Sequence, residues 1–145
     1  MNKYAYVVLL ILSALGILFS LLIAVENSSK SLQNFCSATS AGGCISVQSS
    51  VYGKTFNIDN YVFGITGFAI LSLLTLLKLI HSKSKIIEYF IIAGSIIAGL
   101  VALRFLYIQA FILKTWCIYC IFIDIFSILL LCIGAYLLMK KRIWR

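Results

Sequence analysis

Hydrophobic and polar positions divide this chain into four long apolar runs that are joined by shorter polar segments. Each run has roughly 20 residues or more, which is the length that an α-helix needs to cross the hydrocarbon core of a bilayer. The predicted spans are residues 4–25, 61–80, 86–113 and 117–139. Because they account for most of the chain, little remains for a separate soluble domain. The pattern therefore predicts an all-α membrane protein in which residues 1–145 form one four-transmembrane-helix bundle.

The basic residues predict how this bundle is oriented. With four spans, both termini and the connection between the second and third spans lie on one side of the membrane. Eight of the 12 Lys and Arg residues fall on that side: Lys3, Lys78, Lys83, Lys85, Lys140, Lys141, Arg142 and Arg145. Only three fall on the opposite side, so the excess predicts cytoplasmic termini. The net charge of +8 is therefore a topology signal, and anionic lipid rather than nucleic acid is the expected partner of these residues.

Two cysteines three residues apart, Cys117 and Cys120, stand at the start of the fourth apolar run. Positions i and i+3 share one face of a helix, so both sulfurs can face the same way. If the helix begins near Cys117, its unpaired N–H groups and positive dipole end favour the thiolate, which is the form that exchanges disulfides. By itself the motif fits a redox pair, half of a zinc site or a structural disulfide.

A second pair, Cys36 and Cys44, brackets seven small residues in the only sizeable polar segment, residues 26–60. Two neighbouring glycines let this loop bend, so its cysteines can move. Apolar and aromatic residues follow among polar ones, and residues 47–56 are predicted to form a lid that lies on the membrane surface. The predicted topology places both cysteine pairs at the extracytoplasmic face, where disulfides form and persist.

Three other residues of the apolar runs carry predictions. Cys132 lies twelve residues beyond Cys120, about 18 Å along a helix, and is expected to be a small core residue. Arg104 and Asp124 lie at similar depths on antiparallel spans, and intramembrane charges usually pair or line a polar cavity. We therefore predict an Arg104–Asp124 contact near the cysteines. The alternative is that Arg104 extends outward and Asp124 is protonated.

The four outer cysteines admit three interpretations. A zinc site could use all four as tetrahedral ligands, although structural zinc sites commonly have tighter paired spacings. Two static disulfides are a second interpretation. The third, which the flexible loop favours, is a relay in which electrons move between the two pairs through mixed disulfides. Such a relay in a membrane needs an electron acceptor that dissolves in the bilayer, and lipid-soluble quinones are the obvious class.

Four motifs follow one another in order, with matching spacing and on the same predicted side of the membrane. They are Cys36-x7-Cys44, Ser49-Ser50-Val51-Tyr52-Gly53, Asn60-Tyr61-Val62-Phe63-Gly64 and Cys117-Ile118-Tyr119-Cys120. In this combination nearly the whole chain resembles the vitamin K epoxide reductase family of four-helix membrane thiol–quinone oxidoreductases. The resemblance implies a quinone of the menaquinone, ubiquinone or vitamin K type as co-substrate, and no metal.

The resemblance also implies a role for each outer cysteine. Cys117 and Cys120 correspond to the active-site pair, in which Cys120 faces the quinone and Cys117 exchanges with the loop. Cys44 corresponds to the loop cysteine that forms a transient disulfide with Cys117. Cys36 corresponds to the cysteine that is presented to a thioredoxin-like partner.

Five residues are implied in quinone binding by their places in these motifs. Asn60 matches the asparagine that hydrogen-bonds a quinone carbonyl in the family, although it also suits a helix N-cap. Ser50 matches a family serine near the cysteines, and Tyr52 and Phe63 belong to the same two motifs. Asp124 stands four residues after the second active-site cysteine, where vertebrate members have a tyrosine.

Some relatives carry a fused thioredoxin-like domain, whereas this chain ends at Arg145, so a separate thioredoxin-like protein is the expected extracytoplasmic partner. Reduction potentials decide whether disulfide formation or quinone or epoxide reduction is the purpose. One rival is an unrelated bacterial family of disulfide-forming membrane proteins, in which the two cysteine pairs occur in the reverse order. Another is a non-enzymatic membrane scaffold whose outer loop is held by a static Cys36–Cys44 disulfide.

Overall fold

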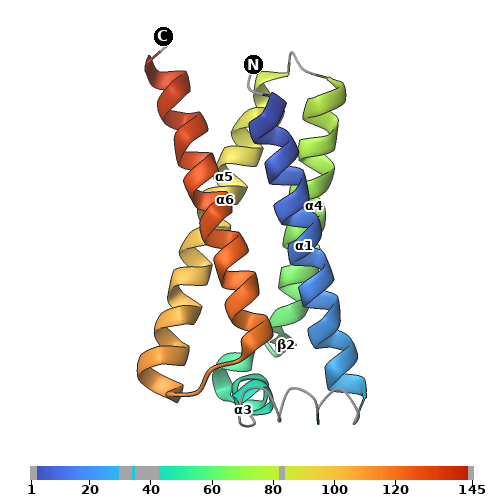
Figure 1. Ribbon diagram of the computed structural model, residues 1–145, viewed down its shortest axis with the longest axis vertical. Helices are drawn as coiled ribbons and strands as arrows, with labels where there is room; N and C mark the ends of the chain where they lie inside the picture. Colours follow the sequence, from blue (N-terminus) through green and yellow to red (C-terminus); the bar gives the residue numbers. More distant parts are fainter. Residues whose placement is uncertain (1–2, 30–33, 35–42, 82–83, 144–145) are drawn as a thin grey trace.

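Four long helices dominate the computed structural model, which describes residues 3–29, 34, 43–81 and 84–143 (Figure 1). These helices are α1 (Lys3–Ser28), α4 (Asn60–Ile80), α5 (Lys85–Tyr107) and α6 (Ile118–Ile143). Each is long and apolar enough to cross a membrane, with the third span running on to Leu113. The four predicted spans are therefore confirmed.

The helices form an antiparallel bundle in which each long helix packs against two neighbours. Helix α1 lies against α4 and α6, and α5 lies against α6 and α4. Both termini and the α4–α5 connection lie at one end of the bundle, which we call the terminus end (Figure 1). The opposite end holds α3 (Gly43–Ser49) and the start of α6, and we call it the cysteine end.

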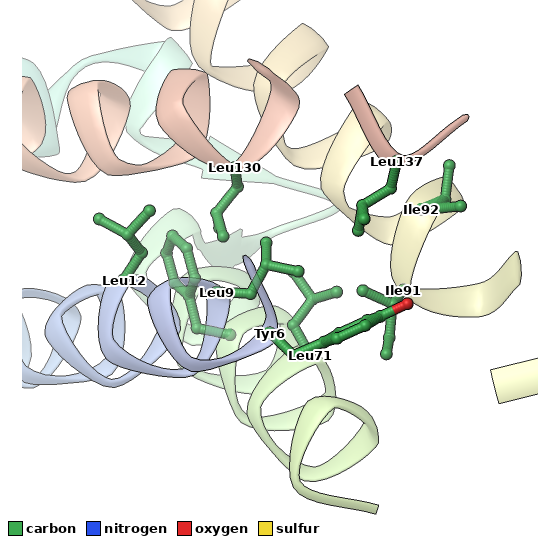
Figure 2. Packing of buried hydrophobic residues seen from close by; sticks show 9 residues of the cluster. Tyr6, Leu9, Leu12, Leu71, Ile91, Ile92, Leu130 and Leu137 are labelled. Carbon is green, nitrogen blue, oxygen red and sulfur yellow. The ribbon is translucent and has the colours of Figure 1, made fainter. Parts of the chain in front are cut away.

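The main hydrophobic core fills the half of the bundle nearer the terminus end. Side chains from all four long helices meet there, as Figure 2 shows. The buried members are Tyr6, Leu9, Leu12, Phe68, Leu71, Ile91, Ile92, Leu130 and Leu137. Helices α5 and α6 approach closely at Gly99, where an added Cβ atom would overlap Leu131 Cβ, as expected where small residues let membrane helices pack.

A compact segment between α1 and α4 covers the cysteine end. Its described part contains α3, a 3-10 turn at Val51–Gly53, and the antiparallel strands β1 (Lys54–Thr55) and β2 (Ile58–Asp59). Phe56 and Asn57 form the turn between the strands. Both have positive φ angles, 53° and 63°, as the tight turn of a two-residue hairpin requires. Helix α3 contacts α6. The predicted lid, residues 47–56, thus lies at the same end of the bundle as the Cys117–Cys120 pair (Figure 1).

The third span does not remain an α-helix to its end. Residues Ile108–Leu113 form a π-helix, and Lys114 then takes a left-handed conformation with φ of 51°. Such wide turns are rare and occur often at functional sites. The hydropathy pattern predicts a continuous helix through Leu113, because the number of residues per turn does not change how apolar a run is.

Candidate active site

The cysteine pair lies at the N-terminus of α6. Cys117 directly precedes the helix, and its Sγ accepts a hydrogen bond from the backbone N–H of Cys120 at 3.4 Å. This is the arrangement of a helix N-cap, so the predicted helix start near Cys117 is confirmed. The two Sγ atoms are 2.7 Å apart, compared with about 2.05 Å in a disulfide, and both thiols are free. The two sulfurs are therefore close enough to form a disulfide with little movement.

Gln109, in the π-helix, connects this pair to the interior of the bundle. Its side chain is 1% exposed. Its Oε1 accepts a hydrogen bond from the Cys117 N–H at 3.2 Å, and its Nε2 donates one to Asp124 Oδ2 at 3.2 Å. Sequence reasoning did not single out this residue. The sequence feature that could have identified it is a side-chain amide inside a predicted membrane span, because polar side chains there usually face the bundle interior.

The predicted Arg104–Asp124 contact is wrong. Arg104 is exposed on the outside of α5, whereas Asp124 is 4% exposed and is bonded to Gln109. The two residues do lie on neighbouring antiparallel helices, as predicted. The third span, however, is rotated about its axis so that Gln109, and not Arg104, faces the bundle interior.

A cavity of about 90 Å³ lies beside Cys120. All four transmembrane spans and the lid contribute to its walls. The lining residues are Ser20, Ile23, Asn27, Val47, Gln48, Tyr52, Gly53, Asp59, Asn60, Tyr61, Gly64, Phe105, Gln109, Cys120, Ile123 and Asp124. Three residues that the resemblance assigns to the quinone, namely Tyr52, Asn60 and Asp124, are thus brought together with Cys120.

Two other assigned residues are not among those that line the cavity. Ser50 donates its hydroxyl hydrogen bond to the Val47 carbonyl at 2.7 Å. Phe63 is 45% exposed on the outside of the bundle. The structure therefore gives their assignment to a quinone no geometric support.

Asn60 holds the lid to the bundle. Its Nδ2 donates to the Tyr52 carbonyl at 2.6 Å, and its Oδ1 accepts from Thr55 Oγ1 at 2.7 Å. The N-cap position of α4 belongs to Asp59, whose side chain makes no capping hydrogen bond. Because a carboxamide has two N–H donors and two acceptor lone pairs, Asn60 keeps capacity for a further bond in the cavity that it lines.

Cys44 and Cys117 belong to one buried cluster beneath the lid. Both are 0% exposed, and Val47 is the third member. Cys44 is disulfide-bonded, and its partner is none of Cys117, Cys120 and Cys132, which are free. The predictions for Cys36 lie outside the described residues.

Cys132 corrects another expectation. The sequence predicts a buried core residue, but the free Cys132 thiol is exposed on the side of α6. In a membrane bundle the lipid-facing surface is as apolar as the core, so a small apolar residue fits either environment.

Buried polar groups without hydrogen bonds surround the cavity. Ser20 Oγ, both carboxylate oxygens of Glu26 and Gln48 Nε2 have no hydrogen-bond partner within the described part of the chain. Glu26 is 1% exposed and has the Gln48 amide beside it. It lines a second cavity of about 250 Å³, which shares Asn27, Gln48 and Asp59 with the first. Sequence reasoning noted Glu26 only as the boundary of the first span.

Comparison with protein families gives one match. The model described as the vitamin K epoxide reductase family matches residues 7–135 of this chain. A search of curated proteins finds no match. The matched region includes all the outer cysteines, Gln109 and the residues that line the cavity.

Proposed function

The chain belongs to the vitamin K epoxide reductase family, and from that premise we propose that it oxidises thiols on the extracytoplasmic side and passes the electrons to a membrane quinone. Membership of the family supports a membrane thiol–quinone oxidoreductase in general. We propose in addition the path of the electrons, the partner that supplies them and the orientation of the chain in the membrane. The purpose that we propose is disulfide formation in exported proteins.

The electron path runs from the loop cysteines to Cys120. A reduced thioredoxin-like partner gives up two thiol protons and two electrons to the Cys36–Cys44 disulfide. The Cys44 thiolate then attacks Cys117 in the Cys117–Cys120 disulfide, which forms a Cys44–Cys117 mixed disulfide and releases Cys120. Attack of Cys36 on Cys44 re-forms the Cys36–Cys44 disulfide and leaves the Cys117–Cys120 pair reduced. Oxidation of the reduced pair transfers two electrons and two protons to the quinone, which leaves as quinol, and restores the Cys117–Cys120 disulfide.

The position of each sulfur supports this order. Cys44 and Cys117 are buried in one cluster beneath the lid, which suits exchange between them. Cys120, the other member of the pair, lines the cavity, whereas Cys117 is not among the lining residues. This division is the single observation on which the proposal rests, because one sulfur of the pair faces the lid and the other faces the space for an acceptor.

The proposed orientation puts the cysteine end outside the cytoplasm and the termini inside. The excess of basic residues at the terminus end supports it. A separate thioredoxin-like protein is the proposed partner. It would meet the chain at the lid, on the oxidising side of the membrane, where the loop cysteines can be reoxidised.

The test measures quinone reduction by purified protein with dithiothreitol as reductant and menadione as acceptor. We expect Cys120→Ser and Cys117→Ser each to lose at least about 100-fold in rate, because neither can form the disulfide that releases the electron pair. Cys132→Ser is the matched control, since it removes the exposed free thiol of the same helix and should leave the rate unchanged.

An undiminished rate in the Cys120→Ser protein would contradict the proposal and favour the non-enzymatic scaffold. A rate that falls equally in the Cys132→Ser protein would show that the measured reduction does not depend on the pair at the helix N-terminus. Thermal unfolding of each variant in detergent controls for loss of fold.

A further inference from the structure

Ser20, on α1, has a buried hydroxyl that makes no hydrogen bond to any residue that the structure describes. Its side chain is 0% exposed, and Oγ has no partner within the part of the chain that the structure describes. Ser13 lies seven residues earlier on the same face of the helix, and its Oγ donates to the Leu9 carbonyl at 2.8 Å. Thr75 and Ser127 likewise donate to the carbonyl one turn earlier. Hydroxyl side chains in membrane helices usually donate a hydrogen bond to the carbonyl one turn earlier in this way. The Ser20 hydroxyl does not.

Ser20 is among the residues that line the cavity beside Cys120 and Asn60. Across from it is Gly64 on α4, where an added Cβ atom would lie 2.7 Å from Ser20 Oγ. Any side chain at Gly64 would therefore occupy the space that the hydroxyl uses. A buried donor on a cavity-lining residue, with no partner in the described part of the chain, is expected to bond to an occupant of that cavity, because an unsatisfied polar group is costly.

We propose that the Ser20 hydroxyl donates a hydrogen bond to one carbonyl oxygen of the quinone. The inference rests on the proposed function and adds a binding residue that the sequence motifs do not contain. Asn60 and Gly64 are four residues apart on α4, a rise of about 6 Å, so Ser20 lies about one helical turn deeper than Asn60. In the proposal, a quinone in the cavity that both residues line offers one carbonyl oxygen to Ser20 and the other towards Asn60.

The hydrogen bond would act mainly during reduction. When the quinone accepts two electrons and two protons from the cysteine pair, negative charge develops on its oxygens before they are protonated. A donor already aimed at one oxygen stabilises that charge without reorganisation. Ser20 is thus proposed to bind and polarise the acceptor, while the electrons come from Cys117 and Cys120.

The experiment compares Ser20→Ala with wild-type protein, using menadione as the varied substrate. We expect the KM for menadione to rise and kcat/KM for menadione to fall about tenfold, the effect of one lost hydrogen bond to a buried group. The KM for the dithiol reductant should not change. Ser95→Ala is the matched control, because Ser95 Oγ is also buried without a partner but packs beside Gly134 and does not line the cavity.

A second variant keeps the proposal testable if Ser20→Ala unfolds. Gly64→Ala leaves the hydroxyl in the chain but puts a methyl group in its space, and it should raise the menadione KM as Ser20→Ala does. A wild-type menadione KM in either folded variant overturns the inference, while the dependence of the reaction on Cys120 still supports the proposed function. Failure of the wild-type protein to reduce menadione instead overturns the proposed function itself.

Discussion

Lys78 at the terminus end and Glu26 at the cysteine end are both buried charged residues, 2% and 1% exposed. Lys78 Nζ donates to Glu88 Oε2 at 3.0 Å and to the Ser84 carbonyl at 2.8 Å. The Glu26 carboxylate has the Gln48 side-chain amide beside it, but outside hydrogen-bonding geometry, so neither oxygen has a partner within the described residues. The same contrast holds for the hydroxyl groups on α1, since Ser13 is satisfied by its own helix and Ser20 is not.

The contrast separates a half of the bundle that is built for stability from a half that is built to bind. The terminus half has a continuous apolar core (Figure 2) and the buried Lys78–Glu88 ion pair. Among the described residues of that core, only the Ser95 hydroxyl beside Gly134 is buried without a partner. The cysteine half has two cavities, and each unsatisfied buried group there costs about 1 to 3 kcal/mol of stability. A chain can retain such groups if the rest of the bundle supplies enough packing and if the groups serve a ligand. Substitutions at the two ends should therefore affect different properties.

The largest effect on stability is expected from breaking the ion pair at the terminus end. Lys78→Met leaves the Glu88 carboxylate without the ammonium group that it contacts at 3.0 Å. The free energy of unfolding should fall by about 3 kcal/mol, as for other buried pairs that lose one partner. Thermal unfolding in detergent measures this change, and quinone reduction per folded molecule should stay near the wild-type value.

The double variant Lys78→Met/Glu88→Met is the control, because two apolar groups of similar size should recover much of the lost stability. If Lys78→Met were as stable as the wild type, the terminus end would not be the stabilising half of the bundle.

An intermediate effect is expected at the cysteine end from Gln109→Leu. This change removes the acceptor for the Cys117 N–H and the donor for Asp124. The first turn of α6 should be positioned less well, and the rate of quinone reduction should fall about tenfold, measured with excess dithiothreitol. Arg104→Leu is the matched control on the same span and should leave the rate unchanged, since Arg104 is exposed.

Equal losses of activity in the Gln109→Leu and Arg104→Leu proteins would contradict the structure and support the Arg104–Asp124 ion pair that was predicted from the sequence. Unchanged activity in Gln109→Leu would mean that its two hydrogen bonds do not position the cysteines.

The smallest effect is expected from removing the charge of Glu26. Glu26→Gln replaces a buried carboxylate that accepts no hydrogen bond with a neutral amide of nearly the same shape. Stability should rise by about 1 kcal/mol, because the cost of burying the carboxylate is removed. The same substitution at the other end, Glu88→Gln, should lower the unfolding temperature, since it weakens the bond from Lys78. Two shifts of the same sign would contradict the comparison between the two ends.

The sequence by itself determined the four membrane spans of this protein and the end of the bundle at which Cys44 and Cys117 lie. Long apolar runs are enough to predict four spans, because the bilayer sets the length of a helix and excludes other spanning structures that lack internal hydrogen bonds. The order of the spans then places the Cys44 loop at the same end as Cys117. The start of the last apolar run also predicted that the helix begins near Cys117, and in the structure it begins at Ile118.

Only the tertiary structure decided which side of each helix faces its neighbours. Lipid and core are equally apolar, so hydropathy does not fix the rotation of a membrane helix about its axis. For this reason Gln109 and not Arg104 meets Asp124, and Cys132 faces outward. The rotation of α1 likewise places Ser20 among the residues that line the cavity, where its hydroxyl has no partner in the described part of the chain.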